Sequence, residues 1–196
     1  MRPFAQFKTY LQRESFLTEE DCALFEPYLR TRNIPAKQHF VEEGKVCHEI
    51  AFINSGVFRM YYLMDGKEVN SHFFFENEFA VDYDSFLEQK PSRYHIQALE
   101  DAEVVCFNLE TLENAYTASK NWEKFGRHIA EYTFKITTRR VEGFLFMDAE
   151  QRYLQLQAQA PHILERIPLY HIASYLGLER ESLSRLRKKI RDQHRL

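Results

Sequence analysis

Hydrophobic and polar residues follow three successive patterns along the chain. Over residues 1–30 apolar side chains recur at helical spacing, and from Gln38 to Asn108 they fall in short runs bounded by turn residues. From about Leu109 onwards helical spacing returns. This order predicts an α+β protein in which a strand-rich body is followed by a series of helices.

The first pattern predicts two helices. Apolar side chains share one face of the first, and Thr18 followed by Asp21 three residues later forms a capping pattern for the second. We expect this second helix to run to Leu29, and the helical region to stop at Pro35. Strands should therefore begin only after that proline.

The second pattern predicts a sandwich or barrel of short strands. The dipeptide Asp65-Gly66 is a strong hairpin signal, because a type I′ turn needs positive φ at both central residues. The 17 Phe and 11 Tyr of the chain favour a well-filled interior. The predicted strands cover residues 39–41, 50–53, 57–63, 69–75, 94–99 and 103–107.

The third pattern contains a helix with two apolar stripes. The first stripe steps by three and four residues, as expected of a helix that pairs with its own copy. Since a helix that is apolar on two sides must contact two surfaces, we expect a twin helix and the body of the same subunit. Packing on its own domain alone is the alternative. The first stripe contains Trp122, Phe125, Ile129, Tyr132 and Ile136, and the second contains Phe134, Val141 and Leu145.

The stretch from Ile167 to Arg191 predicts two short helices around a tight turn. Gly177 supplies the permissive backbone that favours the end of the first helix. One face of the second helix is apolar, and the opposite face is polar and charged, at about 100° per residue. The apolar face contains Leu183, Leu186 and Ile190, and the opposite face Glu181, Ser184, Arg185 and Lys188.

Charge is distributed unevenly along the chain. From Glu179 to the end, seven Lys or Arg stand against three acidic residues, whereas the whole chain has a formal net charge of −3. A basic segment on an acidic body favours binding to an anion, although basic helices are often only solvated. Together with the preceding turn, this segment is typical of a helix-turn-helix that reads double-stranded DNA.

Residues 172–189 of this helix pair read IASYLGLERESLSRLRKK. They resemble the helix pair of the Crp/Fnr superfamily of bacterial transcription regulators, whose pattern is close to I-A-x-x-L-G-x-x-R-E-T-x-S-R. The resemblance implies that Arg180, Glu181 and Arg185 read base edges, since Arg can pair with guanine and Glu can accept from cytosine. It also implies that a serine at the start of the helix bonds a phosphate, and that two lysines contact phosphates without reading sequence. The expected DNA-binding residues are Arg180, Glu181, Ser182, Ser184, Arg185, Lys188 and Lys189.

The strand-rich body resembles the double-stranded jelly roll of the cyclic-nucleotide-binding domain. The residues that carry this second resemblance are Gly44, residues 53–57, Asp65-Gly66 and residues 98–101. Members that bind cyclic AMP use a Gly-Glu pair and an Arg-Ser pair. Here the Gly-Glu is absent from residues 78–82, and Ser92-Arg93 stands in the reverse order.

A cyclic phosphate in a sheltered pocket needs a cation and N–H donors, and Asp82 would oppose it. We therefore expect a small-molecule effector other than cyclic AMP, or no effector. The candidate effector-binding residues are Phe79, Asp82, Tyr83, Ser92, Arg93 and Tyr94.

The sequence gives little support to a metal, iron–sulfur or catalytic site. The three cysteines, Cys22, Cys47 and Cys106, are too few and too dispersed for an iron–sulfur cluster, and we expect them to be small buried side chains. The sequence contains no clustered histidines and carboxylates, so a cupin-like metal-binding enzyme is only an alternative. A regulator that acts through protein partners without DNA is a second alternative. We expect no catalytic residues, no metal and no cofactor.

The combined expectation is a transcription regulator in three parts. Residues 1–116 would form a cyclic-nucleotide-binding-like sensor, residues 117–147 a dimerisation helix, and residues 148–196 a winged-helix-like DNA-binding domain without room for the wing. A hinge is expected near Met147-Asp148. The resemblance implies a homodimer that reads a palindromic operator and contacts RNA polymerase. With no signal peptide and no apolar stretch of membrane-spanning length, we expect a cytoplasmic protein.

Overall fold

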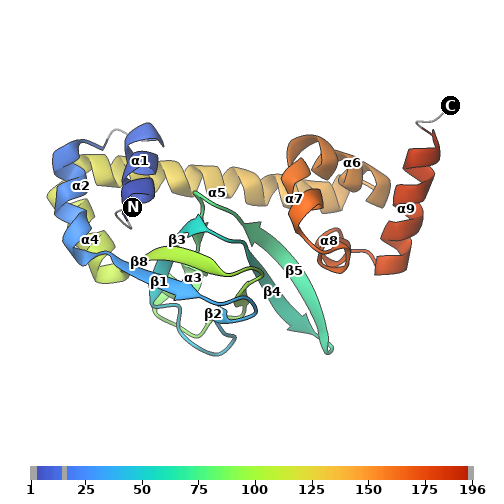
Figure 1. Ribbon diagram of the computed structural model, residues 1–196, viewed down its shortest axis with the longest axis horizontal. Coiled ribbons are helices and arrows are strands. Elements are labelled where there is room, and N and C mark those ends of the chain that lie inside the picture. Colours follow the sequence, from blue (N-terminus) through green and yellow to red (C-terminus); the bar gives the residue numbers. More distant parts are fainter. Residues whose placement is uncertain (1–3, 15–16, 194–196) are drawn as a thin grey trace. The chain divides into compact units, whose positions relative to one another are not determined.

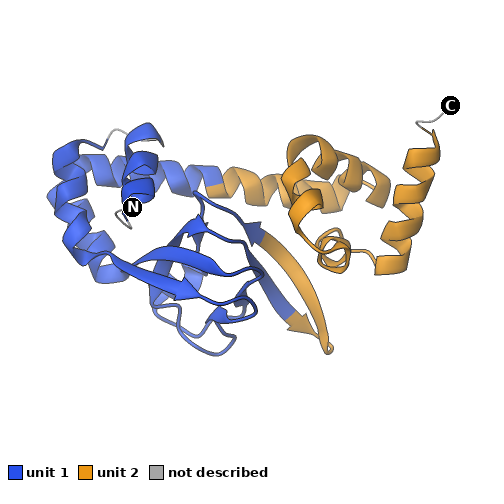
Figure 2. Cartoon of the chain, in the orientation of Figure 1, with its two compact units in different colours: residues 1–62, 73–132 blue, residues 63–72, 133–196 orange. Residues whose placement is uncertain are grey.

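The computed structural model describes residues 4–14 and 17–193, which form two compact units (Figure 1, Figure 2). Unit 1 contains residues 1–62 and 73–132, and unit 2 contains residues 63–72 and 133–196. Two elements belong to both units. These are the hairpin of strands β4 (Phe58–Met64) and β5 (Lys67–Phe74), whose tip lies in unit 2, and the long helix α5 (Lys120–Phe146).

Unit 1 is a jelly roll of two four-stranded sheets with helices beside it. The strand order is β1-β8-β3-β6 in one sheet and β2-β7-β4-β5 in the other. This confirms the α+β class and the jelly roll that the sequence predicts. The remaining strands are β1 (Arg30–Ile34), β2 (His39–Val41), β3 (Glu49–Ser55), β6 (Phe79–Ala80), β7 (His95–Ala98) and β8 (Ala102–Asn108).

The β4–β5 turn has the predicted form, because Asp65 and Gly66 have φ values of 49° and 76°. Strand β1, in contrast, was missed by the sequence pattern, which places helix and then Pro35 there. It pairs antiparallel with β8, from Arg30 opposite Cys106 to Ile34 opposite Ala102. Only its last residue is buried. An edge strand with polar side chains has no alternation that marks it as a strand.

Most helices of unit 1 gather at one end of the roll (Figure 1). These are α1 (Ala5–Glu14), α2 (Glu19–Phe25), a short 3₁₀ turn (Glu26–Tyr28), α4 (Leu109–Ala118) and the first part of α5, whereas α3 (Tyr83–Glu88) lies beside the strands. The predicted capping pattern is confirmed, since Thr18 and Asp21 form a capping box at the start of α2. Helix α2 nevertheless ends at Phe25, four residues before the predicted end.

The first apolar stripe of α5 packs on its own domain. Trp122 and Phe125 are buried in the core cluster of the roll, and Ile129 packs against that cluster. The indole of Trp122 stacks on Phe25 with ring centroids 4.4 Å apart. The interpretation of this stripe as the seam for a twin helix is therefore wrong at Trp122 and Phe125, because the roll already buries their side chains.

The second apolar stripe is exposed. Phe134, Val141 and Leu145 have relative accessibilities of 71%, 52% and 69%. All three lie in the part of α5 that belongs to unit 2. The second stripe is thus exposed at all three residues, whereas the first is exposed only at Tyr132.

Unit 2 is helical apart from the hairpin tip. Helices α8 and α9 form the predicted helix pair, and the expected break after Phe146 is confirmed, because Asp148 caps α6 in a capping box with Gln151. The hinge motion expected at this break stays a prediction. The helices after α5 are α6 (Ala149–Gln159), α7 (Pro161–Arg166), α8 (Leu169–Tyr175) and α9 (Arg180–Gln193).

Pro161 and Pro168 enclose a short helix, α7, since Pro161 occupies its first turn and Pro168 the position before α8. None of the helices in the described residues is both long and apolar enough to cross a membrane.

Candidate nucleic-acid interface and effector site

The turn between α8 and α9 depends on a glycine. Gly177 has φ +71°, and the amide of Leu178 donates back to the Ala173 carbonyl at 2.9 Å, which closes the end of α8. A Cβ on Gly177 would also come within 3.0 Å of the Phe144 ring. The position therefore needs glycine both for its backbone angle and for the close approach of α5.

Two arginines hold the helix pair in unit 2. Arg152 of α6 donates from Nε and Nη2 to the Leu176 carbonyl at 3.2 and 3.1 Å, and from Nη1 to the Met147 carbonyl at 2.6 Å. Arg140 of α5 donates from Nη2 to the Tyr175 carbonyl at 3.0 Å. These carbonyls lie at helix ends, where they have no partner within the helix. The sequence pattern did not single out either arginine for this role.

Helix α9 has the two faces that the sequence predicts. Leu183 and Ile190 are 0% and 7% exposed, and Leu186 is half-buried beside them. The opposite side of the helix is open to solvent. Of the seven expected DNA-binding residues, Ser182 is half-buried, and the six exposed ones are Arg180, Glu181, Ser184, Arg185, Lys188 and Lys189.

Three of these seven residues, Ser182, Arg185 and Lys189, have side-chain partners among the described residues. The Arg185 guanidinium donates to the Ser182 hydroxyl at 3.3 Å, and the Lys189 ammonium lies 2.6 Å from Glu150 at the start of α6. Lys189 thus points along the side of the helix towards α6. Such exposed ion pairs contribute little to stability, about 0–1 kcal/mol, and are readily exchanged for another anion.

A basic groove runs beside α9 within unit 2. It has a volume of about 640 Å³, and α6, α8 and α9 contribute to its walls. Three expected residues line it together with Arg187 and Arg191, which the sequence analysis counted as charge but did not assign to the site. The lining residues are Tyr153, Gln157, Leu169, Ser184, Arg185, Arg187, Lys188, Ile190 and Arg191. The basic surface of unit 2 therefore includes this groove as well as the solvent-exposed face of α9.

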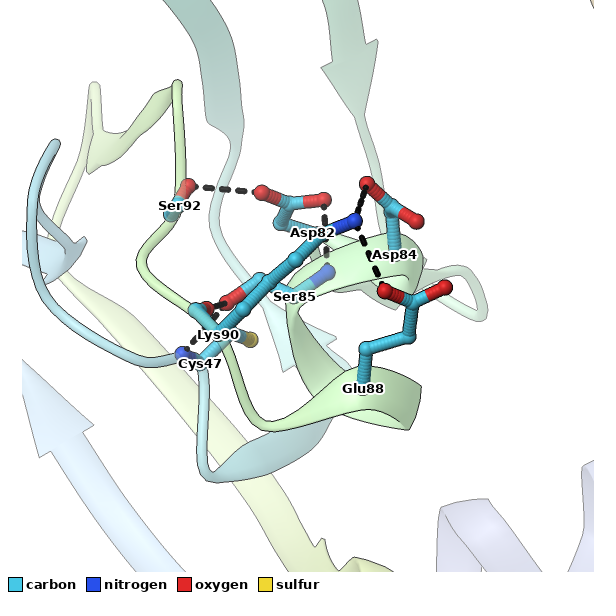
Figure 3. A network of polar contacts seen from close by, with 7 residues as sticks. All are labelled: Cys47, Asp82, Asp84, Ser85, Glu88, Lys90 and Ser92. Carbon is cyan, nitrogen blue, oxygen red and sulfur yellow. Dashed lines mark hydrogen bonds and ion pairs between the residues drawn. The ribbon is translucent and has the colours of Figure 1, made fainter.

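Two of the expected effector residues of unit 1, Asp82 and Ser92, are in contact at the start of α3, where Asp82 is held by its neighbours (Figure 3). Its carboxylate accepts from the Ser92 hydroxyl at 2.6 Å and from the Ser85 amide at 3.4 Å, as the cap of α3. Asp82 and Ser92 are 5% and 2% exposed. The structure thus brings two of the predicted residues into direct contact, but with each other.

The network around Asp82 extends through three loops. The Ser92 hydroxyl accepts from the Tyr94 amide at 3.0 Å. The Ser85 hydroxyl accepts from the Cys47 amide at 2.9 Å and donates to the Lys90 carbonyl at 2.5 Å (Figure 3). These bonds satisfy the polar groups that would otherwise converge on a ligand. The site is therefore closed by the chain itself, with a carboxylate in its centre.

The other candidate effector residues are not gathered there. Phe79 packs in the aromatic core, 5.4 Å from Phe52 between ring centroids. Tyr83 is 41% exposed and stacks on Phe86. Arg93 is exposed. An arginine that would meet a cyclic phosphate is thus not placed in this network.

The three cysteines are buried, as expected. Burial raises the pKa of the Cys47 thiol to about 11 and that of the Cys106 thiol to about 12. Both stay protonated at neutral pH, so neither is an activated thiolate.

Residues 31–119 match the family model of the cyclic nucleotide-binding domain. Among solved structures, a putative transcriptional regulator of the Crp/Fnr family from Eubacterium rectale has a TM-score of 0.73 at 17% identity, over 94% of this chain and 88% of that chain. A mutant of CooA from Carboxydothermus hydrogenoformans has a TM-score of 0.71 at 17% identity, over 90% and 82%. The c-di-GMP responsive global regulator CLP of Xanthomonas campestris has a TM-score of 0.66 at 16% identity, over 90% and 93%. No curated protein sequence matches the chain significantly.

The chain thus has a segment, residues 31–119, that matches the model of the cyclic nucleotide-binding domain, and a helix-turn-helix formed by α8 and α9. Its fold is that of the Crp/Fnr transcription regulators, which confirms the resemblance seen in the sequence at the level of the fold.

Glu78, in the stretch where cyclic-AMP binders carry Gly-Glu, yields a prediction on stability. Burial raises the pKa of its carboxyl to about 7. A raised pKa means that the ionised form is disfavoured in the folded state, so stability is highest below the unfolded value near 4.5 and falls as pH rises towards 7. We expect Glu78→Gln to raise the free energy of unfolding at pH 8 by on the order of 1–3 kcal/mol and to change it little at pH 4.5.

Urea unfolding at the two pH values measures this difference. Glu113→Gln, at an exposed position of α4, is the matched control and should show no such pH dependence. An equal effect of Glu78→Gln at both pH values would contradict the role of ionisation.

Proposed function

We propose that this protein is a DNA-binding transcription regulator of the Crp/Fnr type, which reads double-stranded DNA with α9. The observation that carries the proposal is the exposed face of α9, where Arg180, Glu181 and Arg185 stand outward from a helix-turn-helix. In this motif the second helix enters the major groove with its amino-terminal residues on the base edges. All three residues lie in the first two turns of α9.

Each residue on this face has a chemical role. Arg180 and Arg185 donate to O6 and N7 of guanine, and Glu181 accepts from N4 of cytosine. Ser182 and the amides at the start of α9 bond a phosphate. Ser184 faces the groove beside the helix.

The remaining basic side chains increase the affinity for DNA but do not read its base sequence. Lys188 together with Arg187 and Arg191 makes the groove wall basic. Phosphate contacts of this kind release counterions and make binding fall with salt. Lys189 joins them when a phosphate replaces its partner Glu150.

The proposed assembly is a homodimer on a palindromic operator. Two recognition helices then meet half-sites one DNA turn apart. The second stripe of α5 is the proposed contact, since Phe134 and Leu145 are exposed at helical spacing and would be covered by a twin helix. Residues 117–147 keep their proposed role in dimerisation, with the seam moved to this stripe.

The proposed effector, if one binds, is not cyclic AMP. Support comes from Asp82, whose buried carboxylate would face the phosphate, and from Arg93, which is exposed. CLP, with a similar fold, is described as c-di-GMP responsive, so the fold is compatible with different effectors. As a cytoplasmic transcription regulator rather than an enzyme, the protein would also contact RNA polymerase.

Selection of bound sequences from a random DNA pool tests the proposal. We expect a palindrome to be enriched to the same extent with and without cyclic AMP at fixed salt. Enrichment only with cyclic AMP would overturn the interpretation of Asp82 and Ser92. No enrichment in either arm would favour a regulator that acts through protein partners.

Substitutions on α9 separate base reading from phosphate contact. Arg185→Ala should lose roughly 1–3 kcal/mol of preference at one base position, because a bidentate contact to guanine is removed. Lys188→Ala should weaken binding to all sequences alike and reduce the salt slope by about 1. Fluorescence anisotropy on the selected operator and on scrambled DNA, at several salt concentrations, measures both. Equal losses on the two DNAs for Arg185→Ala would contradict its role.

A charge in the second stripe of α5 should dissociate the dimer. Phe134→Glu places a carboxylate where a twin helix would bury the ring, and we expect the dimer dissociation constant to rise by about 100-fold or more. Sedimentation velocity measures it. Lys135→Glu, at the adjacent exposed position off the stripe, is the control. A monomeric wild-type protein, or a dimer that withstands Phe134→Glu, would show that the stripe is not the interface.

A further inference from the structure

The tip of the β4–β5 hairpin is hydrogen-bonded to α8 within unit 2. The Ser174 hydroxyl donates to the Glu68 carbonyl at 2.8 Å and accepts from the Asn70 amide at 3.0 Å. Strand β5 is the edge strand of its sheet. The Ser174 side chain thus bonds one carbonyl and one amide of β5, which are groups that an edge strand offers to another strand.

A buried polar pair lies beside this serine. Asn70 and His171 are 1% and 4% exposed, and the amide nitrogen of Asn70 lies 3.3 Å from Nδ1 of His171. The amide oxygen of Asn70 is buried without a hydrogen-bond partner among the described residues. A buried acceptor without a partner costs free energy. The Asn70–His171 pair therefore favours this particular arrangement of the hairpin on α8 but adds little net stability to it.

The contact reaches both ends of the turn between the helices. Arg140 donates from one nitrogen, Nη2, to the Asn70 carbonyl at 3.2 Å and to the Tyr175 carbonyl at 3.0 Å, so it joins the hairpin to the end of α8. The Lys67 ammonium lies 3.0 Å from the carboxylate of Glu179, directly before α9. Both side chains of this ion pair are 74% exposed, so it adds little binding energy.

The hairpin occupies groups that DNA would need. In a helix-turn-helix the first helix crosses the DNA backbone, and its polar side chains contact phosphates. Here the first helix is α8, and its polar side chains Ser174 and His171 are engaged by the hairpin. The acidic side chains of Asp65 and Glu68 on the same hairpin would also repel a phosphate backbone.

We propose that the hairpin tip, residues 63–72, is an autoinhibitory latch on α8 that competes with DNA for the helix pair. The inference rests on the proposed DNA-binding function and adds its regulation. A chain whose latch is closed does not bind, so the apparent affinity for DNA is reduced by the fraction of open molecules. Weakening the latch from the hairpin side should therefore strengthen DNA binding.

The test is Asn70→Ala, which leaves every residue of α8 and α9 in place. It removes the unsatisfied oxygen of Asn70, but it also takes from Nδ1 of the buried His171 its bond to the hairpin, so these two effects offset and the net change is the loss of one hydrogen bond. We expect about fivefold tighter binding to the selected operator, the effect of one hydrogen bond on the equilibrium between closed and open latch. Fluorescence anisotropy at fixed salt measures it, and thermal unfolding checks the fold. Met64→Ala, at an exposed position of the same hairpin, is the control and should bind as wild type does.

Hydrogen exchange on the wild-type protein tests the latch without a substitution. Amides of residues 67–72 should exchange faster when the selected operator is bound, because DNA displaces the hairpin. Unchanged or slower exchange there, or unchanged or weaker binding by a folded Asn70→Ala, would overturn the latch while leaving the DNA-binding function intact. A wild-type protein that binds no DNA in the selection would overturn the proposed function, and the latch with it.

Discussion

The packing of Trp122 at the start of α5 is the interaction that anchors the long helix in the core of unit 1. Its ring is buried against Phe25, and its indole nitrogen donates to the Asp21 carbonyl at 3.1 Å. The Asp21 carboxylate also accepts from Asn121 at 2.9 Å. Burial would raise the pKa of Asp21, but hydrogen bonds from Ser119, the Thr18 backbone and Asn121 lower it to about 2. An ionised cap therefore joins α2 to the first turn of α5, and so sets where the helix that enters unit 2 begins.

Some basic side chains of unit 2 are held only by exposed ion pairs, whose acidic partner is readily replaced by another anion. Lys189 is paired with Glu150 and Lys67 with Glu179, in contacts that are exposed to solvent. Pairs of this kind contribute about 0–1 kcal/mol and are screened by salt. Arg152, which caps the end of α8, instead makes three bonds to main-chain carbonyls. Arg152 is thus tied to the backbone, whereas Lys189, a proposed DNA-binding residue, is held only by an exposed ion pair and is available to a phosphate.

The hydrogen-bond network around Asp82 holds together the loops of the predicted effector site. A jelly roll that binds a cyclic phosphate needs positive charge and free amides at this place. Here the carboxylate caps α3, and Ser92 and Ser85 satisfy the surrounding loops. The same segments are held in place by internal hydrogen bonds instead of by a nucleotide.

Local chemistry made much of this structure predictable from sequence. The Thr18 and Asp21 capping box, the Asp65-Gly66 turn and the Gly177 helix end each depend on neighbouring residues, and all three are present. The two faces of α9 follow from a 3.6-residue period and are also present. Strand β1 was missed because a polar edge strand has no period of its own.

Only the tertiary structure decided which surfaces of these elements meet. Sequence showed two stripes on α5, but the roll covers the one with Trp122 and leaves Phe134 exposed. Sequence placed Asp82 and Ser92 near one another along the chain, but not in a bond that closes the site. The contact of Ser174 with Asn70 spans 104 residues, and no local pattern indicates it. Capping, turns and helical faces are set by residues a few positions apart, whereas partners distant in sequence are set by how the whole chain packs.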